Sequence, residues 1–290
     1  SDLGIFRWSS MNWIKIFAHY VRCGLLRPRY ILILIIFLIP CVACYSTVKS
    51  MDCSHTWIDY MIYSFQGLKP INVANASLEF HLPINWLLIM TCCMFLNLDY
   101  MLSDMTNFGQ QVIIRCKNRT DWFLSKCMWN LCSTLMYFCC GWLTMVLFAL
   151  ITGGRITMEN APQISGYVFS SIIENITDST FNITSTQVLI YCMILPMLST
   201  SALNLLQMTL CLYVKPILSF ITIMCILVIS LFWHSPLALG NGAMLLRSAL
   251  FFSGGIKPVS IAIAALSSIV ICVFGGTLKF KKANILSMEE

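Results

Sequence analysis

The sequence predicts an all-α polytopic membrane protein with six transmembrane helices in a single domain, residues 1–290. Of its 290 residues, 58% are hydrophobic and 10% are charged, whereas a soluble domain has about 25% charged residues. Six apolar stretches are each long enough to cross ~30 Å of hydrocarbon, where only helices satisfy their own backbone. The stretches are Tyr30–Val48, Pro83–Leu102, Lys126–Ile151, Val188–Tyr213, Pro216–Trp233 and Pro258–Thr277.

An amphipathic helix within residues 11–28 is predicted before the first stretch. Its polar residues recur at three- and four-residue steps on one face: Asn12, Lys15, His19 and Arg22. Aromatic and aliphatic side chains fill the rest of its surface, which is typical of a helix lying flat in the headgroup region. The helix, which ends at Pro28, is either a simple anchor or a lateral elbow that also contacts a cytoplasmic partner.

The basic residues predict that both termini are cytoplasmic. Most of the 18 Lys and Arg residues lie before the first stretch, between the second and third, or after the sixth. These segments share one side of the membrane if six helices cross it, and cytoplasmic loops carry the excess of basic residues. The net charge of +6 is therefore an orientation signal and does not indicate nucleic-acid binding.

The cytoplasmic connection 103–125 is the strongest candidate for a partner-binding segment. Asp104 or Thr106 is suited to cap a short helix whose apolar residues include Phe108 and Val112. A short helix with exposed apolar side chains can dock into a groove on a partner. The alternative is a solvated loop whose charges only set the topology.

The connection 235–257, between the fifth and sixth stretches, is too apolar for a solvated loop. Its run from Met244 to Phe252 is too short to span a membrane, and Gly and Pro residues punctuate both ends. We predict two short re-entrant helices that dip into the outer leaflet and return. A charge at that depth, Arg247, either contacts a headgroup or acidic substrate or pairs within the protein. Asn241 and Arg247 are the candidate contacts here.

The sequence contains no motif for catalysis or cofactor binding. It has no GxxxxGK[ST] phosphate loop, so the chain is not expected to hydrolyse ATP itself. Most of its 15 cysteines lie inside the apolar stretches, where they act as small apolar residues. The run Cys53–His55 offers too few ligands for a metal. We therefore predict no catalytic site, no metal and no cofactor in this chain.

Three segments resemble the membrane subunit of a bacterial ATP-binding-cassette (ABC) exporter of the type-2 permease kind, similar to permeases for peptide export and bacteriocin immunity. They are Met11–Pro28, the run 109–115 with Arg119, Trp122 and Lys126, and the run 235–247. The resemblance implies that the loop after the second span carries a coupling helix that fits a cleft on the ATPase. The implied coupling residues are Asp104, Thr106, Gly109, Gln110, Arg115, Arg119 and Lys126, and those of the elbow helix are Lys15, His19 and Arg22.

The resemblance further implies an ATP-driven exporter that works by alternating access in the bacterial cell membrane. ATP and Mg would bind to partner ATPase subunits, and a second permease chain, identical or homologous, would complete a pathway near spans two and five. The cargo would be amphipathic and peptide-like or lipid-like, as in antimicrobial-peptide export or immunity. Asp99 and Asp104 are both candidates for the acidic residue before the coupling helix, and the loops 51–82 and 152–187 have no assigned role.

A stand-alone secondary transporter or a membrane sensor subunit is the alternative. Ion-coupled transporters place ionisable residues at mid-membrane, whereas the centres of the six stretches are almost bare of charge. The two halves of the chain also show no convincing similarity to each other. An ATPase that co-purifies with the chain would decide between these classes.

Overall fold

The structure, a computed structural model, describes residues 31–70, 82–98, 119–164, 166, 183–251 and 254–282. These ranges are helical and contain no β-strand, which confirms the all-α prediction for them. The elements are α2 (Ile31–Met51), α3 (Trp57–Phe65), α5 (Ile84–Leu96), α8 (Arg119–Ile151), α10 (Ser185–Val188), η3 (Leu189–Ile194), α11 (Leu195–Leu210), α12 (Pro216–Phe232), η4 (Leu239–Ala243), η5 (Leu245–Arg247) and α13 (Pro258–Lys282). η3 is π-helical, and η4 and η5 are 3-10 helices.

Four helices of the described chain are long and apolar enough to cross a membrane: α2, α8, the continuous run α10–η3–α11, and α13. Two further apolar helices, α5 and α12, are shorter. Each of the apolar stretches predicted from the sequence coincides with one of these helices. The chain is therefore a multi-pass membrane protein.

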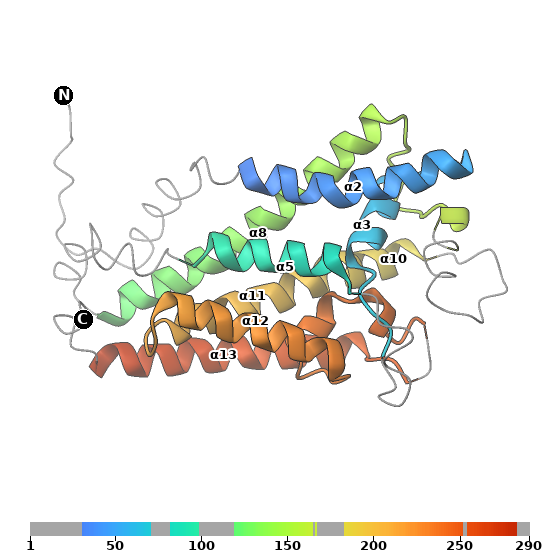
Figure 1. Cartoon of the computed structure of the whole chain (residues 1–290). Helices are drawn as coiled ribbons and strands as arrows, with labels where there is room; N and C mark the ends of the chain where they lie inside the picture. Colours follow the sequence, from blue (N-terminus) through green and yellow to red (C-terminus); the bar gives the residue numbers. More distant parts are fainter. Residues whose placement is uncertain are drawn as a thin grey trace, which may run out of the picture.

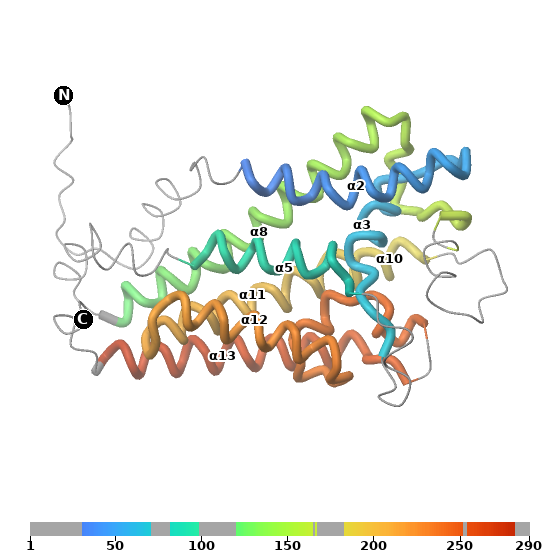
Figure 2. Tube along the Cα trace, viewed as in Figure 1, coloured from blue at the N-terminus to red at the C-terminus, as the bar shows by residue number. Residues whose placement is uncertain are grey.

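The apolar helices form one bundle in which successive helices run in opposite directions (Figures 1 and 2). α2, α8 and α12 run from left to right in this view, whereas α5, the run α10–η3–α11, and α13 run back. Packed pairs include α11 with α13, α2 with α8, and α11 with α8. As a result, α2 begins and α13 ends on the same side of the bundle, which we call the base.

The run α10–η3–α11 is the most buried of the four long helices. Its π-helical segment, Leu189–Ile194, ends two residues before Pro196. Proline lacks a backbone N–H and its ring collides with the carbonyl four residues earlier, so a wider turn at this point relieves the conflict. After the proline, Thr200 Oγ1 donates to the carbonyl oxygen of Pro196 at 2.6 Å.

The opposite end of the bundle, which we call the cap, consists of α3, residues 152–164, η4 and η5 (Figure 1). A backbone hydrogen bond from Leu246 N to Gln66 O, 3.0 Å long, joins two of its parts. Gly67 has a φ of 72° and lies so close to Met244 that an added Cβ would be 2.5 Å from that side chain. Glycine suits both the left-handed backbone and the close approach.

Two regions differ from the sequence-based expectation. The connection 51–82, expected as an outer loop, contains α3, whose side chains are nearly all buried. Residues 119–125, expected within the loop 103–125, are instead the first turns of α8, and the boundary of that loop is corrected accordingly. Residues 103–118 and the predicted elbow helix at 11–28 lie outside the described residues.

Candidate functional site

The predicted site residues fall into two groups in the structure. Those described are Arg119 and Lys126 at the start of α8, and Asn241 and Arg247 in the cap. Those outside the described residues are Lys15, His19, Arg22, Asp104, Thr106, Gly109, Gln110 and Arg115. The start of α8 and the cap are at opposite ends of the bundle (Figure 1), so no single site unites the described residues.

The start of α8 packs against the end of α13 at the base. The rings of Trp122 and Phe280 stack with centroids 5.0 Å apart, and Phe123 stacks on the same phenylalanine at 6.0 Å. The ammonium of Lys126 lies 5.2 Å from the centre of the Trp122 ring, and the whole side chain is buried. Because Lys126 is enclosed, any effect it has on a partner passes through the residues packed around it.

The Arg247 side chain donates four hydrogen bonds to described residues of the cap and α12, and it is 1% exposed. Its Nε donates to Leu68 O at 3.0 Å and its Nη1 to Asn241 Oδ1 at 2.6 Å. Nη1 and Nη2 also donate to the carbonyl oxygens of Ser230 and Leu231, near the C-terminal end of α12. Burial lowers the pKa of Arg247 to about 10, so the guanidinium stays charged at neutral pH.

Asn241 completes the attachment to α12. Its Nδ2 donates to the carbonyl oxygens of Trp233 and Ser235, each at 2.8 Å. Helix C-termini leave carbonyl groups without intrahelical partners and carry partial negative charge, which a cation stabilises. Of the two alternatives left open for Arg247, the geometry therefore favours pairing within the protein. The connection 235–257 has two short 3-10 helices, of 5 and 3 residues, in its described part.

A buried carboxylate joins α3 to the segment that follows α8. Asp59 Oδ2 accepts hydrogen bonds from Thr56 N at 2.8 Å and Thr56 Oγ1 at 3.0 Å, and Oδ1 accepts one from Ala161 N at 3.0 Å. Burial raises the pKa of Asp59 to about 6, although these hydrogen bonds oppose the shift. No role for Asp59 is predicted from the sequence, although a Thr followed three residues later by an acid before an apolar run is a capping-box signal.

His55 lies beside this carboxylate segment and makes a second link to the end of α8. Its Nε2 is 3.0 Å from Thr152 Oγ1, and the hydroxyl of Tyr60 is 3.2 Å from the same oxygen. Burial lowers the pKa of His55, so the ring is neutral at pH 7. Asp59 and His55 together fix two cap segments that are about a hundred residues apart in the sequence.

An apolar groove of about 490 Å³ opens between α2, α5 and α12. The α5 side of the groove extends from Ile84 to Phe95, and the ring centroid of Phe95 is 6.3 Å from that of Phe220 on α12. Thr91 Oγ1 lies 3.5 Å from Met224 Sδ across the same pair of helices. The groove thus exposes the contact between the second and fifth predicted spans on a lateral surface of the bundle.

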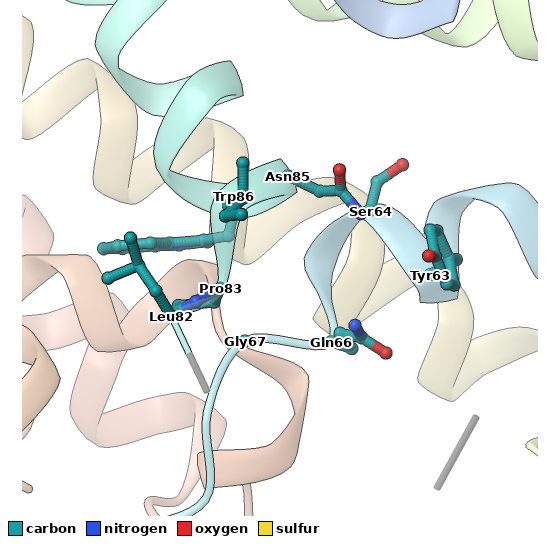
Figure 3. A pocket seen from close by; sticks show the side chains of 9 residues that line it. Tyr63, Ser64, Gln66, Gly67, Leu82, Pro83, Asn85 and Trp86 are labelled. Atoms are coloured by element: carbon teal, nitrogen blue, oxygen red, sulfur yellow. The ribbon is translucent and has the colours of Figure 1, made fainter. Parts of the chain in front are cut away.

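A smaller and more polar pocket, of about 280 Å³, lies between α3 and the start of α5. Figure 3 shows Ser64, Gln66 and Asn85 on one side of the pocket, and Leu82, Pro83 and Trp86 on the other. Ser64 Oγ donates to Tyr60 O at 2.7 Å, which leaves its oxygen able to accept a hydrogen bond. Ile84 lines both this pocket and the apolar groove.

A polar junction joins α5, α8 and α11 inside the bundle. Asn204 Nδ2 donates to Thr134 Oγ1 at 2.8 Å and lies 3.3 Å from Cys93 Sγ, and Gln207 Nε2 donates to Met94 O at 3.2 Å. The amide oxygens of Asn130, Asn204 and Gln207 are buried without a hydrogen-bond partner in the described structure. Unsatisfied buried acceptors are costly, so the closed packing of this junction is a weak point of the bundle.

The described residues bring no three His, Cys, Asp or Glu side chains together in a way that would hold a metal ion. Residues 31–286 match the family described as "Protein of unknown function (DUF2705)", and because this match covers most of the chain, the protein belongs to that family. No curated protein and no solved structure matches the chain.

Proposed function

We propose that this family member is the membrane subunit of a bacterial ATP-driven ABC exporter of the type-2 permease kind. It would move an amphipathic, peptide-like or lipid-like substrate across the cell membrane, as in antimicrobial-peptide export or immunity. ATP and Mg would bind to separate cytoplasmic ATPase subunits, and a second permease chain would complete the pathway. The chain itself supplies the moving helices and no chemistry.

Six membrane crossings are part of this proposal. α5 and α12 are shorter than the other apolar helices, but each lies between two long ones and continues the alternation of direction (Figure 1). An even number of crossings puts the beginning of α2 and the end of α13 on one side. The basic residues before α2 and after α13 favour the cytoplasm for that side, which makes the cap extracellular.

The observation that carries the proposal is the open contact between α5 and α12. These helices are the second and fifth predicted spans, which line the substrate pathway in the family that the sequence resembles. Their shared groove is apolar and opens laterally, which suits a cargo that partitions into the membrane. A second permease chain facing this surface would enclose a pathway between the two copies.

Force from an ATPase would enter at the base. The coupling segment precedes α8, and α8 is fixed to α13 there by the stacked Trp122 and Phe280 rings. A displacement of the coupling segment would therefore move both helices together. α8 and α13 both pack on α11, so the movement would reach the centre of the bundle.

Charge reversal tests this coupling assignment. In the purified complex, Arg115→Glu combined with Arg119→Glu should lower substrate-stimulated ATP hydrolysis about tenfold, which corresponds to ~1.4 kcal/mol of lost coupling. The matched control reverses two exposed basic residues at the cap end, Lys49→Glu and Arg155→Glu, and should leave hydrolysis unchanged. Normal substrate-stimulated ATP hydrolysis in the Arg115/Arg119 variant, with the complex intact, would contradict the assignment of this segment as the coupling segment.

A further inference from the structure

The polar pocket and the apolar groove meet at one residue. Ile84, in the first turn of α5, lines both, so the two cavities follow one another along the same helix. A polar cavity at the cap end that continues into an apolar one has the shape and polarity of an amphipathic molecule. We propose that together they form a binding site for one membrane lipid, with the head in the pocket and one acyl chain in the groove.

The pocket offers uncharged polar groups to the lipid head group. The side-chain amides of Gln66 and Asn85 line it and make no hydrogen bond within the described structure. Trp86 closes one side of the pocket with a side chain that is only 1% exposed. The N-cap residue of α5, Pro83, makes no side-chain capping bond; in the first turn, Ile84 N donates to Leu82 O at 2.8 Å, and no described residue accepts from Asn85 N or Trp86 N.

These groups favour a particular kind of head. Amides supply both donors and acceptors, and the N-terminal turn of α5 adds partial positive charge. None of the described residues lining the pocket or the groove is charged. The site therefore suits a zwitterionic or neutral polar head group: the partial charge of the helix turn can contact a phosphate, but no described lining residue supplies the full positive charge that a net anionic head group would need.

The groove has the length of one lipid chain. It follows α5 from Ile84 to Phe95, and eleven residues of helix rise about 17 Å. Half of the ~30 Å hydrocarbon core is one leaflet, so a chain entering at the cap end would reach approximately the middle of the membrane. Leu32 and Ile36 of α2 and Phe220 and Met224 of α12 form the walls.

As a binding site, this assignment rests on the geometry alone. Its use as the point where cargo enters the pathway rests on the proposed function, because α5 and α12 are the helices along which cargo would pass. The two are tested separately when binding is measured on the chain without an ATPase or transport.

The test uses the full-length chain in nanodiscs of phosphatidylcholine that carries a photoactivatable diazirine on one acyl chain. After illumination, mass spectrometry should find residues 84–95 labelled about tenfold more than residues 259–270 on the outer face of α13. Leu88→Trp fills the groove and should reduce labelling of α5 to the level of α13. The matched control, Ile263→Trp, changes an exposed side chain on α13 and should leave α5 labelling unchanged.

Head recognition is tested by Gln66→Ala combined with Asn85→Ala, which leaves the groove intact. Labelling of α5 by limiting phosphatidylcholine probe should fall about fivefold, while labelling by a diazirine-bearing fatty alcohol, which lacks the head, should not change. Equal labelling of α5 and α13 would contradict the proposed lipid site. So would an equal loss of α5 labelling in Leu88→Trp and Ile263→Trp. A strict requirement for anionic phosphatidylglycerol, or no effect of the double alanine variant, would overturn the assignment of the head.

Discussion

Arg247 Nη1 donates to Asn241 Oδ1 at 2.6 Å, and both side chains are buried beside the C-terminal end of α12. The asparagine uses its Nδ2 group to bind the carbonyl oxygens of Trp233 and Ser235, so the pair closes the end of the helix from two sides. A charge placed deep in this apolar connection is thus a structural element of the cap. It holds η4 and η5 against α12 and against residue 68 of the segment after α3.

Removal of this guanidinium should destabilise the cap. Arg247→Met leaves the carbonyl oxygens of Leu68, Ser230 and Leu231 without their donor, and buried hydrogen bonds to charged groups contribute about 1.5–3 kcal/mol each. We expect a loss of about 3 kcal/mol or more in the free energy of unfolding, measured by thermal unfolding in detergent. The control Arg155→Met changes an exposed arginine and should have little effect; equal stability of the two variants would contradict this role.

Asp59 should make cap stability depend on pH. Its pKa of about 6 in the folded state exceeds the ordinary 3.8, so the folded protein binds the proton more readily than the unfolded chain. Protonation of Asp59 therefore increases the free energy of unfolding as pH falls from 6 toward 4. Above pH 6 the carboxylate is charged in the folded protein, and burying that charge lowers stability by its full amount. The expected gain is up to about 3 kcal/mol.

The comparison is between the wild type and Asp59→Asn, which does not titrate. Melting temperatures measured from pH 7 to pH 5 should rise in the wild type relative to the variant. His55, whose pKa is lowered, contributes in the opposite direction, losing stability as pH falls below about 6.5, but it is common to both proteins. A constant difference between the two proteins over this range would refute the assignment of the titration to Asp59.

In the polar junction, replacing Asn204 by an apolar residue should reduce stability less than removing the acceptor that its amide uses. Asn204→Leu deletes a buried oxygen that has no partner along with the hydrogen bond to Thr134, so stability should stay within about 1 kcal/mol of the wild type. Thr134→Val leaves the Asn204 amide without its oxygen acceptor and should cost about 1–3 kcal/mol, more than Asn204→Leu. Thermal unfolding in detergent measures both, and a large loss of stability in Asn204→Leu alone would contradict this prediction.

The Trp122–Phe280 stack should couple α8 to α13 energetically. A double-mutant cycle with Trp122→Leu and Phe280→Leu should give an interaction free energy of about 1 kcal/mol, as for other buried aromatic pairs. The matched control is the pair Phe95 and Phe220, where Phe95 is 57% exposed and the interaction should be smaller. Additive effects of the Trp122 and Phe280 substitutions would contradict a mechanical link at the base.

The positions of the long helices could be predicted because hydropathy is a local property of the sequence. The cap could not, since its contacts join distant segments: Arg247 donates to Leu68, and Asp59 accepts from Ala161. α3 was missed because its apolar side chains were read as part of a loop, although the Thr56 and Asp59 spacing was a usable signal. The burial of Lys126 could not be predicted either: its ammonium lies over Trp122, one turn earlier in α8, and that ring stacks on Phe280 of α13, which is a tertiary contact.

The most direct test of the proposed function is to identify the subunits that accompany the chain. The tagged protein is purified from its native host in mild detergent, and the co-purifying proteins are identified by mass spectrometry and quantified. The account predicts a stoichiometric ATPase of the ABC type together with a second permease chain, identical or homologous. A chain that purifies alone, under conditions that keep known ABC complexes intact, would contradict the account and favour a stand-alone transporter or a sensor subunit.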